Sequence, residues 1–443
     1  MRLKERQEQL KKSPDHNLAQ LATAPRVAAN GLIDRRVFLQ RSMAGGLALA
    51  GGITTARAGA IGEHARPWQQ RSGAPMSASG SPSRFVEGEL QRGVLQPYGP
   101  IAPGTGVSMT PLHQLHGTIT PNNLHFERHH NGVPDIDPEQ HALTIHGLVK
   151  RPLVFDLEAL LRYPMTHRIC FIECSGNSFF NTFAEPRVLP CGMIHGLVSC
   201  SEWTGVPLSI LLDEAGVDAS AKWVVAEGVD AATMVRSIPL GKAMADVMVA
   251  LYQNGEPVRP EQGYPMRLVN PGYEGNTSIK WLHRIKLTDR PAHSRDETSK
   301  YTDLLPDGKA EQFTFTMGVK SVITHPSAGM TIWRNGFYQI SGLAWSGAGR
   351  IHRVEVSADG GKTWADAHLH APVLDKSLTR FSMAWHWDGA PVQLQSRATD
   401  DKGRVQVTRA QWQSRYAPGQ LYHYNAIQSW VVNDQGEVSN AYL

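Results

Sequence analysis

The sequence predicts a mixed α+β domain followed by an immunoglobulin-like all-β sandwich. Between residues 141 and 290, short β-branched and aromatic runs alternate with turn residues and a few helical segments. Beyond residue 312, strand-like runs recur at regular intervals. The 443 residues are enough for two or three domains, each with its own core.

The first 58 residues are predicted to be an export signal rather than part of the fold. The paired arginines Arg35 and Arg36 precede a mildly apolar stretch at 43–53 and then the cleavage-like triplet Ala56-Arg57-Ala58. This order is typical of a twin-arginine signal, and the apolar stretch is too short to span a bilayer. The alternative is an amphipathic helix with two chance arginines. We therefore expect a periplasmic protein, exported folded with a bound cofactor, without a transmembrane segment in the mature chain.

The charge of the chain changes once this leader is set aside. The leader carries 10 of the 44 basic and 4 of the 40 acidic residues, so the rest holds 34 basic against 36 acidic side chains, a net charge of −2. The basic character of the whole chain thus gives no support to nucleic-acid binding. With 41% hydrophobic and 19% charged residues, the composition is that of a globular protein.

Composition and periodicity divide the remaining chain into three parts. Residues 59–105 are dense in Gly, Pro and Ser and are predicted to form an extended arm. The α+β domain is predicted over 106–311 and the sandwich over 312–443. In the first domain we expect a helix at 208–215 and strands at 141–145, 168–172, 223–227, 247–252 and 266–269. In the sandwich we expect strands at 338–345, 351–357, 363–369, 381–387 and 392–399.

Two common nucleotide-binding motifs are missing from the sequence. It contains no G-x-G-x-x-G after a strand and no P-loop, which argues against a Rossmann dinucleotide site and against an NTPase.

Cys174 lies at the end of the strand-like run 168–172. The turn Ser175-Gly176-Asn177 follows it and lets the backbone approach a ligand. A thiolate here can be a nucleophile, a disulfide partner or a ligand to a soft metal, and a buried structural cysteine is the simpler alternative.

The other three cysteines are Cys170, Cys191 and Cys200. The chain has no C-x-x-C pair and no C-x-x-C-H motif, which argues against a zinc ribbon and a c-type haem. A disulfide among these three is left open, because only their distance in space decides it.

A polar loop at 122–134 contains three histidines and Arg128. Histidines without helical i, i+4 spacing are weak evidence for zinc, so a solvated loop or an incidental metal patch are the competing interpretations.

Five landmarks in chain order resemble the sulfite oxidase family of molybdenum enzymes. They are the loop Phe126-x-Arg128-x-His130, Cys174 in Cys-x-Gly-Asn, residues 264–272 with Arg267, Lys280-Trp281-Leu282, and Tyr301. Within the family, residues 118–122, 124–130, 297–308 and 424–428 are similar to the molybdenum subunit of the sulfane dehydrogenase in the thiosulfate-oxidising Sox system. The resemblance implies a sulfite-oxidase-type molybdopterin-binding domain followed by an immunoglobulin-like dimerisation domain.

The resemblance also implies a cofactor, molybdenum with molybdopterin in the form without an appended nucleotide. It makes Cys174 the metal ligand, because a soft thiolate suits molybdenum. Arg128 becomes the oxyanion-binding arginine, and Tyr301 the active-site tyrosine that passes a proton. The implied cofactor contacts are Phe126, His130, Asp230, Arg267 and Lys280. The competing interpretations are a surface salt bridge for Arg128, an interdomain aromatic for Tyr301 and a satisfied buried carboxylate for Asp230.

The implied function is oxidation of sulfane sulfur bound to a carrier-protein cysteine, with electrons passed to a c-type cytochrome subunit. The family pairing implies a homodimer within a heterotetramer. Many sulfite oxidases carry basic residues shortly after the Cys-x-Gly-Asn segment, where this chain has Ser178-Phe179-Phe180. Fewer positive charges favour a carrier-bound substrate over free sulfite. Three alternatives stay open: a sulfite dehydrogenase, a thiol hydrolase using Cys174 with a histidine, and a metal-free scaffold.

Overall fold

The computed structural model describes residues 27–33, 90–96 and 104–442, with a few single residues between 72 and 85. Most of the predicted export signal and most of the predicted arm therefore lie outside the described residues. In the ranges that are described, no helix is long and apolar enough to cross a lipid bilayer.

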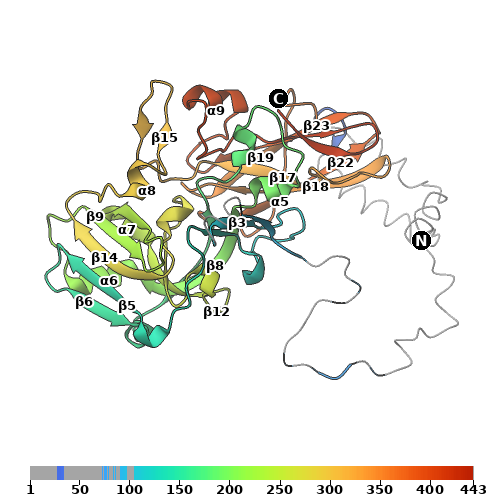
Figure 1. Ribbon diagram of the computed structural model, residues 1–443. Helices are drawn as coiled ribbons and strands as arrows, with labels where there is room; N and C mark the ends of the chain where they lie inside the picture. The colour runs from blue at the N-terminus through green and yellow to red at the C-terminus, as the bar shows by residue number, and fades with distance from the viewer. Residues whose placement is uncertain are drawn as a thin grey trace. The chain divides into compact units, whose positions relative to one another are not determined.

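Two five-stranded sheets form the α+β domain (Figure 1). The first sheet is mixed, because β14 and β5 run parallel while the other pairs are antiparallel. In spatial order it contains β10 (Val235–Pro239), β9 (Trp223–Gly228), β14 (Leu282–Thr288), β5 (Ala142–Gly147) and β6 (Leu153–Asp156). The second sheet is antiparallel and contains β12 (Glu256–Pro257), β11 (Met248–Gln253), β8 (Val198–Pro207) and β7 (Thr166–Glu173), with β13 (Arg267–Val269) paired to β11.

Short helices fill the space beside these sheets. Helix α6 (Leu208–Ala215) buries leucines at 208, 211 and 212, the i, i+3, i+4 spacing that places side chains on one helix face. It ends at Gly216, whose φ of +70° suits a helix C-terminus. The other α-helices within the described residues are α4 (Leu157–Leu161), α5 (Cys191–His195), α7 (Leu240–Asp246), α8 (Arg295–Thr298) and α9 (Arg409–Arg415).

A small sheet joins the predicted arm to the polar histidine loop. Strands β2 (Gly93–Leu95), β3 (Gly106–Met109) and β4 (Glu127–His129) pair in that order. β2 lies inside the segment that we predicted to be an extended arm, where the Gly, Pro and Ser content obscures a three-residue strand. This sheet holds β4, and with it Arg128, in place.

The second domain is a sandwich of two sheets, drawn in orange to red in Figure 1 except for β1 near the N-terminus, which is blue. One sheet contains β1 (Leu32–Ile33), β22 (Thr379–Trp387), β18 (Gly336–Trp345) and β17 (Lys320–His325), with β21 (His368–Leu369) on β22. The other contains β20 (Ala365–Asp366), β19 (Ile351–Ser357), β23 (Val392–Asp400), β24 (Ser429–Val432) and β25 (Val438–Ala441). The predicted order of an α+β domain and an all-β sandwich is confirmed.

One expected strand of the sandwich is wrong. Residues 363–369 do not form a single strand but two short ones, β20 and β21, which pair with β19 and β22 respectively. The segment therefore crosses from one sheet to the other, and no single alternating pattern describes it.

The segment 27–32 packs beside β22. The backbone N–H of His386 donates to the carbonyl of Gly31 at 2.9 Å, and Leu32 is fully buried in the sandwich core. Gly31 has φ +89°, and a Cβ at this position would lie 1.9 Å from the carbonyl oxygen of His386. A glycine is therefore required for this close approach.

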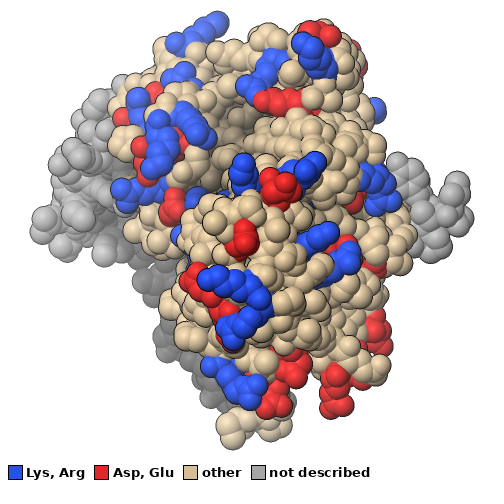
Figure 2. Space-filling view, turned by 90° about the vertical axis from the view of Figure 1, so that its left-hand side faces the viewer, with Lys and Arg blue, Asp and Glu red and all other residues tan. Residues whose placement is uncertain are grey.

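The two domains share a continuous hydrophobic core. Phe171 of β7 and Ile194 of α5 belong to the same buried cluster as Trp345, Trp385 and Trp430 of the sandwich. The end of β7 is thus held by both domains. On the face shown in Figure 2, acidic and basic side chains lie interspersed.

Candidate active site

One cavity is lined by all eight residues that the resemblance singled out. They are Phe126, Arg128, His130, Cys174, Asp230, Arg267, Lys280 and Tyr301. We call this space the inner cavity. Their placement together is a property of the fold, while the individual roles stay predictions.

Cys174 enters the inner cavity from the loop after β7. β7 pairs with β8 up to Glu173, and the backbone N–H of Cys174 then donates to the carbonyl of Leu197 at 2.9 Å. The N–H of Asn177 donates back to the carbonyl of Cys174 at 2.8 Å, which closes a tight turn around the thiol. The strand and the turn therefore fix the position of the Cys174 sulfur at the inner cavity.

The chemistry around the thiol disfavours a hydrolase. Burial raises the pKa of Cys174, whereas a cysteine nucleophile needs a lowered pKa. No histidine among the described residues hydrogen-bonds to its sulfur. All four cysteines are free thiols, so the structure contains no disulfide among Cys170, Cys191 and Cys200.

Arg128, His130 and Tyr301 lie on the same side of the inner cavity. The Tyr301 hydroxyl and His130 Nε2 share a hydrogen bond of 3.0 Å. Burial and then the charge of Arg128 lower the pKa of His130 to about 3, so its ring is neutral at pH 7. Burial raises the pKa of Tyr301, which keeps its proton. Tyr301 has a left-handed backbone with φ +54°, a conformation that non-glycine residues adopt mainly under constraint.

Two basic side chains, Lys280 and Arg267, line the inner cavity together. The Lys280 amine donates to the carbonyls of Arg128 and Glu261 at 3.3 and 3.1 Å, and lies 2.9 Å from Nδ1 of His129. Burial and then the charge of Arg267 lower the pKa of Lys280 well below its usual range. Burial also lowers the pKa of Arg267, to about 9. An anionic ligand in the cavity would favour the charged form of both side chains.

Several buried polar atoms at the inner cavity have no hydrogen-bond partner in the described part of the chain. They are His125 Nε2, Arg267 Nε and Asn276 Oδ1. Buried polar groups are normally paired, so these atoms indicate a polar ligand. A pterin has ring donors and acceptors for such atoms, and its phosphate suits the cations. The residues therefore fit molybdopterin, with Arg267 and Lys280 toward the phosphate and Cys174 toward the metal.

The histidine-rich loop contributes to this cavity and not to a separate metal site. His125, His129 and His130 all line the inner cavity. Across the described ranges, no three His, Cys, Asp or Glu side chains are grouped to hold a metal ion.

A second, larger space adjoins the inner cavity. This outer chamber has a volume of about 620 Å³. Arg128, His130, Cys174 and Tyr301 line both spaces. The outer chamber is also lined by Phe179, Arg295, Lys300 and Tyr422. Phe179 belongs to the segment that departs from many sulfite oxidases, but the sequence assigned no site role to Arg295, Lys300 or Tyr422. Lys300 lies in a stretch used for the resemblance, and Tyr422 lies two residues before another.

The sandwich supplies side chains that hold the Cys174 loop. The Lys320 ammonium lies 3.4 Å from the Glu173 carboxylate and donates to Ser178 Oγ at 2.7 Å. The Trp345 indole donates to Glu173 at 2.7 Å. Sequence reasoning assigned the sandwich only packing and oligomerisation, because residues so far apart in the chain show no common pattern.

Two protein-family models match the chain: "Oxidoreductase molybdopterin binding domain" over residues 130–295 and "Mo-co oxidoreductase dimerisation domain" over 311–429. Mitochondrial sulfite oxidase of Mus musculus is 32% identical over 288 residues, which cover 61% of this chain and 52% of that protein. The NADPH nitrate reductase of Phytophthora infestans is 31% identical over 315 residues, covering 63% of this chain and 34% of that protein. The chain spans about half the length of the curated sulfite oxidases that it matches.

A solved structure aligns with nearly the whole described chain. The crystal structure of the sulfane dehydrogenase SoxCD from Paracoccus pantotrophus has a TM-score of 0.82 and 44% identity, covering 86% of this chain and 97% of that chain. With the cavity described above, these matches establish molybdenum with molybdopterin as the cofactor. The chain therefore belongs to the sulfite oxidase family of molybdopterin-binding oxidoreductases.

Proposed function

We propose that this chain is the molybdenum subunit of a periplasmic sulfane dehydrogenase, which oxidises sulfane sulfur on a carrier-protein cysteine during thiosulfate oxidation. The observation that carries the proposal is the outer chamber of about 620 Å³ in front of Cys174. A chamber of this size suits a ligand much larger than a free sulfite ion, such as the end of a peptide arm. The 44% identity to a SoxCD chain supports the same choice.

Each residue at the boundary of the two spaces has a task in this reaction. The bound cofactor supplies two-electron redox chemistry and oxygen-atom transfer. Each oxygen atom added to the sulfur comes from water and releases two protons and two electrons. The fixed positive charge of Arg128 binds the oxidised sulfur oxyanion as negative charge develops on it. Arg295 and Lys300 add positive charge around the outer chamber.

The hydrogen bond between Tyr301 and His130 gives protons a path out of the inner cavity. Tyr301 is protonated and His130 is neutral at pH 7, so the pair can pass a proton without holding a net charge. Both residues also line the outer chamber, from which the proton reaches water.

The electrons are proposed to leave to a separate c-type cytochrome subunit, because the chain has no C-x-x-C-H motif of its own. The match to a dimerisation domain supports a homodimer, here within a heterotetramer with that cytochrome. The paired arginines at 35 and 36 support export to the periplasm. The pterin is proposed to be the form without a nucleotide.

The test begins with the molybdenum content of the protein purified from a host periplasm. About one molybdenum per chain is expected by elemental analysis, and none in a host that loads other molybdenum enzymes would contradict the proposal. The loaded protein is then assayed with a persulfidated carrier protein and with sulfite, using cytochrome c as the electron acceptor. Faster turnover of free sulfite, without any need for the carrier, would instead make the chain a sulfite dehydrogenase.

A further inference from the structure

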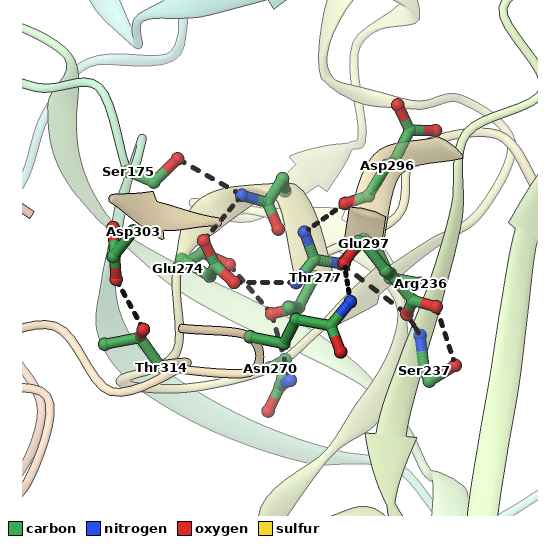
Figure 3. A network of polar contacts seen from close by, with 12 residues as sticks. Ser175, Arg236, Ser237, Asn270, Glu274, Thr277, Asp296, Glu297, Asp303 and Thr314 are labelled. Carbon is green, nitrogen blue, oxygen red and sulfur yellow. Dashed lines mark hydrogen bonds and ion pairs between the residues drawn. The ribbon is translucent and has the colours of Figure 1, made fainter. Parts of the chain in front are cut away.

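We propose that Glu274 is a positioning residue that fixes the Cys174 loop and the ring of Tyr301 relative to each other. The inference rests on the proposed function only in treating Cys174 and Tyr301 as parts of one reaction centre. Glu274 follows β13 and touches neither of them directly. It lies in the buried polar network of Figure 3, between Ser175 and Arg236.

On one side, Glu274 forms an ion pair with Arg236, whose guanidinium lies against the ring of Tyr301. Arg236 of β10 donates through Nη2 to Glu274 Oε1 at 2.7 Å, and both side chains are about 1% exposed. The Arg236 guanidinium carbon lies 5.3 Å from the centre of the Tyr301 ring, within the range of a cation–π contact. A second bond, from Arg236 Nη1 to the carbonyl of Asp296, fixes the guanidinium plane. The tyrosine ring thus lies against a cation whose nearer counter-charge is Glu274, at 2.7 Å, while the Glu297 carboxylate lies 4.0 Å from Arg236 Nε.

On the other side, Glu274 reaches the residue after Cys174. The amide of Asn276 donates both to Glu274 Oε2 at 2.9 Å and to Ser175 Oγ at 3.2 Å. The backbone of Glu274 also forms a parallel bridge with Glu173, the residue before Cys174. Glu274 therefore contacts Glu173 through its backbone, and its carboxylate reaches Ser175 through the amide of Asn276.

The third contact comes from the sandwich. His423 donates its backbone N–H to the carbonyl of Ser175 at 2.8 Å, and its Nε2 lies 3.7 Å from Glu274 Oε2. Burial alone would raise the pKa of Glu274, but the charges of Arg236 and His423 and the bonds from His423 and Asn276 lower it. The carboxylate is therefore charged and lies between Arg236 and the ring of His423, which come from different elements.

The substitution Glu274→Gln keeps the shape of this residue and removes its charge. We expect hydrogen exchange of the Asn177 and His423 amides, read on peptides by mass spectrometry, to become at least tenfold faster. Alkylation of Cys174 should accelerate as well, while the three fully buried cysteines stay protected. Both readouts use the full chain, and alkylation is measured on the protein without molybdenum, so they hold even if the proposed substrate is wrong. In the loaded enzyme kcat should fall at least tenfold, with KM changed less than threefold.

The matched control is Glu355→Gln. Glu355 is also a buried carboxylate paired with an arginine, Arg397 at 3.0 Å, but it lies in β19 of the sandwich. A purely structural role for Glu274 predicts that both variants lower the melting temperature and that neither changes the local exchange or kcat. That outcome would overturn the proposal.

A second variant keeps the proposal testable if Glu274→Gln does not fold. Ser175→Ala removes only the hydroxyl that accepts from Asn276 and leaves the pair of Arg236 and Glu274 intact. Exchange of the Asn177 amide should rise at least threefold in this variant. Exchange at the wild-type rate would contradict the link between Glu274 and the cysteine loop.

Discussion

Replacing Lys320 with methionine should destabilise the protein by leaving a buried carboxylate without its counter-ion. Lys320 and Glu173 are each about 1% exposed, and their charged groups lie 3.4 Å apart beside Cys174. Glu173 keeps two hydrogen bonds in this variant, from the Trp345 indole and from the Asn177 amide. The loss of folding stability is therefore expected to be large, but smaller than the loss caused by a buried charge without any hydrogen bond.

The expected loss of folding free energy follows from these contacts. Removing one partner of a buried ion pair costs about 3–5 kcal/mol, and the two remaining hydrogen bonds to Glu173 place this case near 3 kcal/mol. For domains of this size, each kcal/mol corresponds to about 2–4 °C, so the melting temperature should fall by about 6–12 °C. Adding Glu173→Gln to Lys320→Met should recover part of this loss, because no unpaired charge is then left.

Thermal unfolding of the full chain, followed by circular dichroism, measures both effects. The control is Lys309→Met, which breaks an ion pair with Asp307 in which both side chains are more than half exposed. Exposed pairs contribute at most about 1 kcal/mol, so its melting temperature should hardly change. The reasoning fails if Lys320→Met melts within about 2 °C of the wild type, or if the double variant is less stable than Lys320→Met alone.

Three further predictions concern the cysteine, a buried histidine and the N-terminal segment. Cys174→Ser should abolish turnover with an unchanged circular dichroism spectrum, and full activity would remove the metal-ligand assignment. Burial alone would lower the pKa of His423, but Glu274 and Asp303 raise it above its ordinary value of 6.5. Its contribution to stability should be complete below about pH 6.5 and should be lost as the pH rises through the raised pKa. Urea unfolding at several pH values should show this decline in the wild type and a flatter profile in His423→Gln. Gly31→Ala should release the segment 27–32 and speed exchange of the His386 amide at least tenfold, because the added Cβ overlaps a carbonyl oxygen. Gly117→Ala, at a similar positive φ with open space around it, should leave that amide unchanged.

Local sequence patterns predicted the bounds of a helix or strand correctly where that element packs on a single neighbouring surface. The helix expected at 208–215 and the strand expected at 351–357 have those bounds in the structure, because their apolar spacing continues to the last residue. The same patterns predicted a single strand at 363–369, which is wrong because this segment forms two short strands that pair with different sheets. Periodicity describes one face of one element, and it carries no information about a change of partner.

For the site, sequence motifs predicted the eight residues that line the inner cavity, but not the residues that hold the Cys174 loop in position. Lys320 meets Glu173 across 147 residues of sequence. Glu274 and His423 likewise pair only through the tertiary fold. A buried ion pair needs no fixed spacing in the chain, so a single sequence shows only two ordinary charged residues.

The segment 27–32 packs on the folded sandwich although most of the chain around it precedes the α+β domain. Leu32 finds its buried position only once β22 and the core beneath it have formed. Arg35 and Arg36 follow only three and four residues later in the chain. In the proposed export signal, the residues just before the paired arginines therefore pack only on a chain whose sandwich has folded. Cleavage after residue 58, which that proposal implies, would remove these six residues from β22.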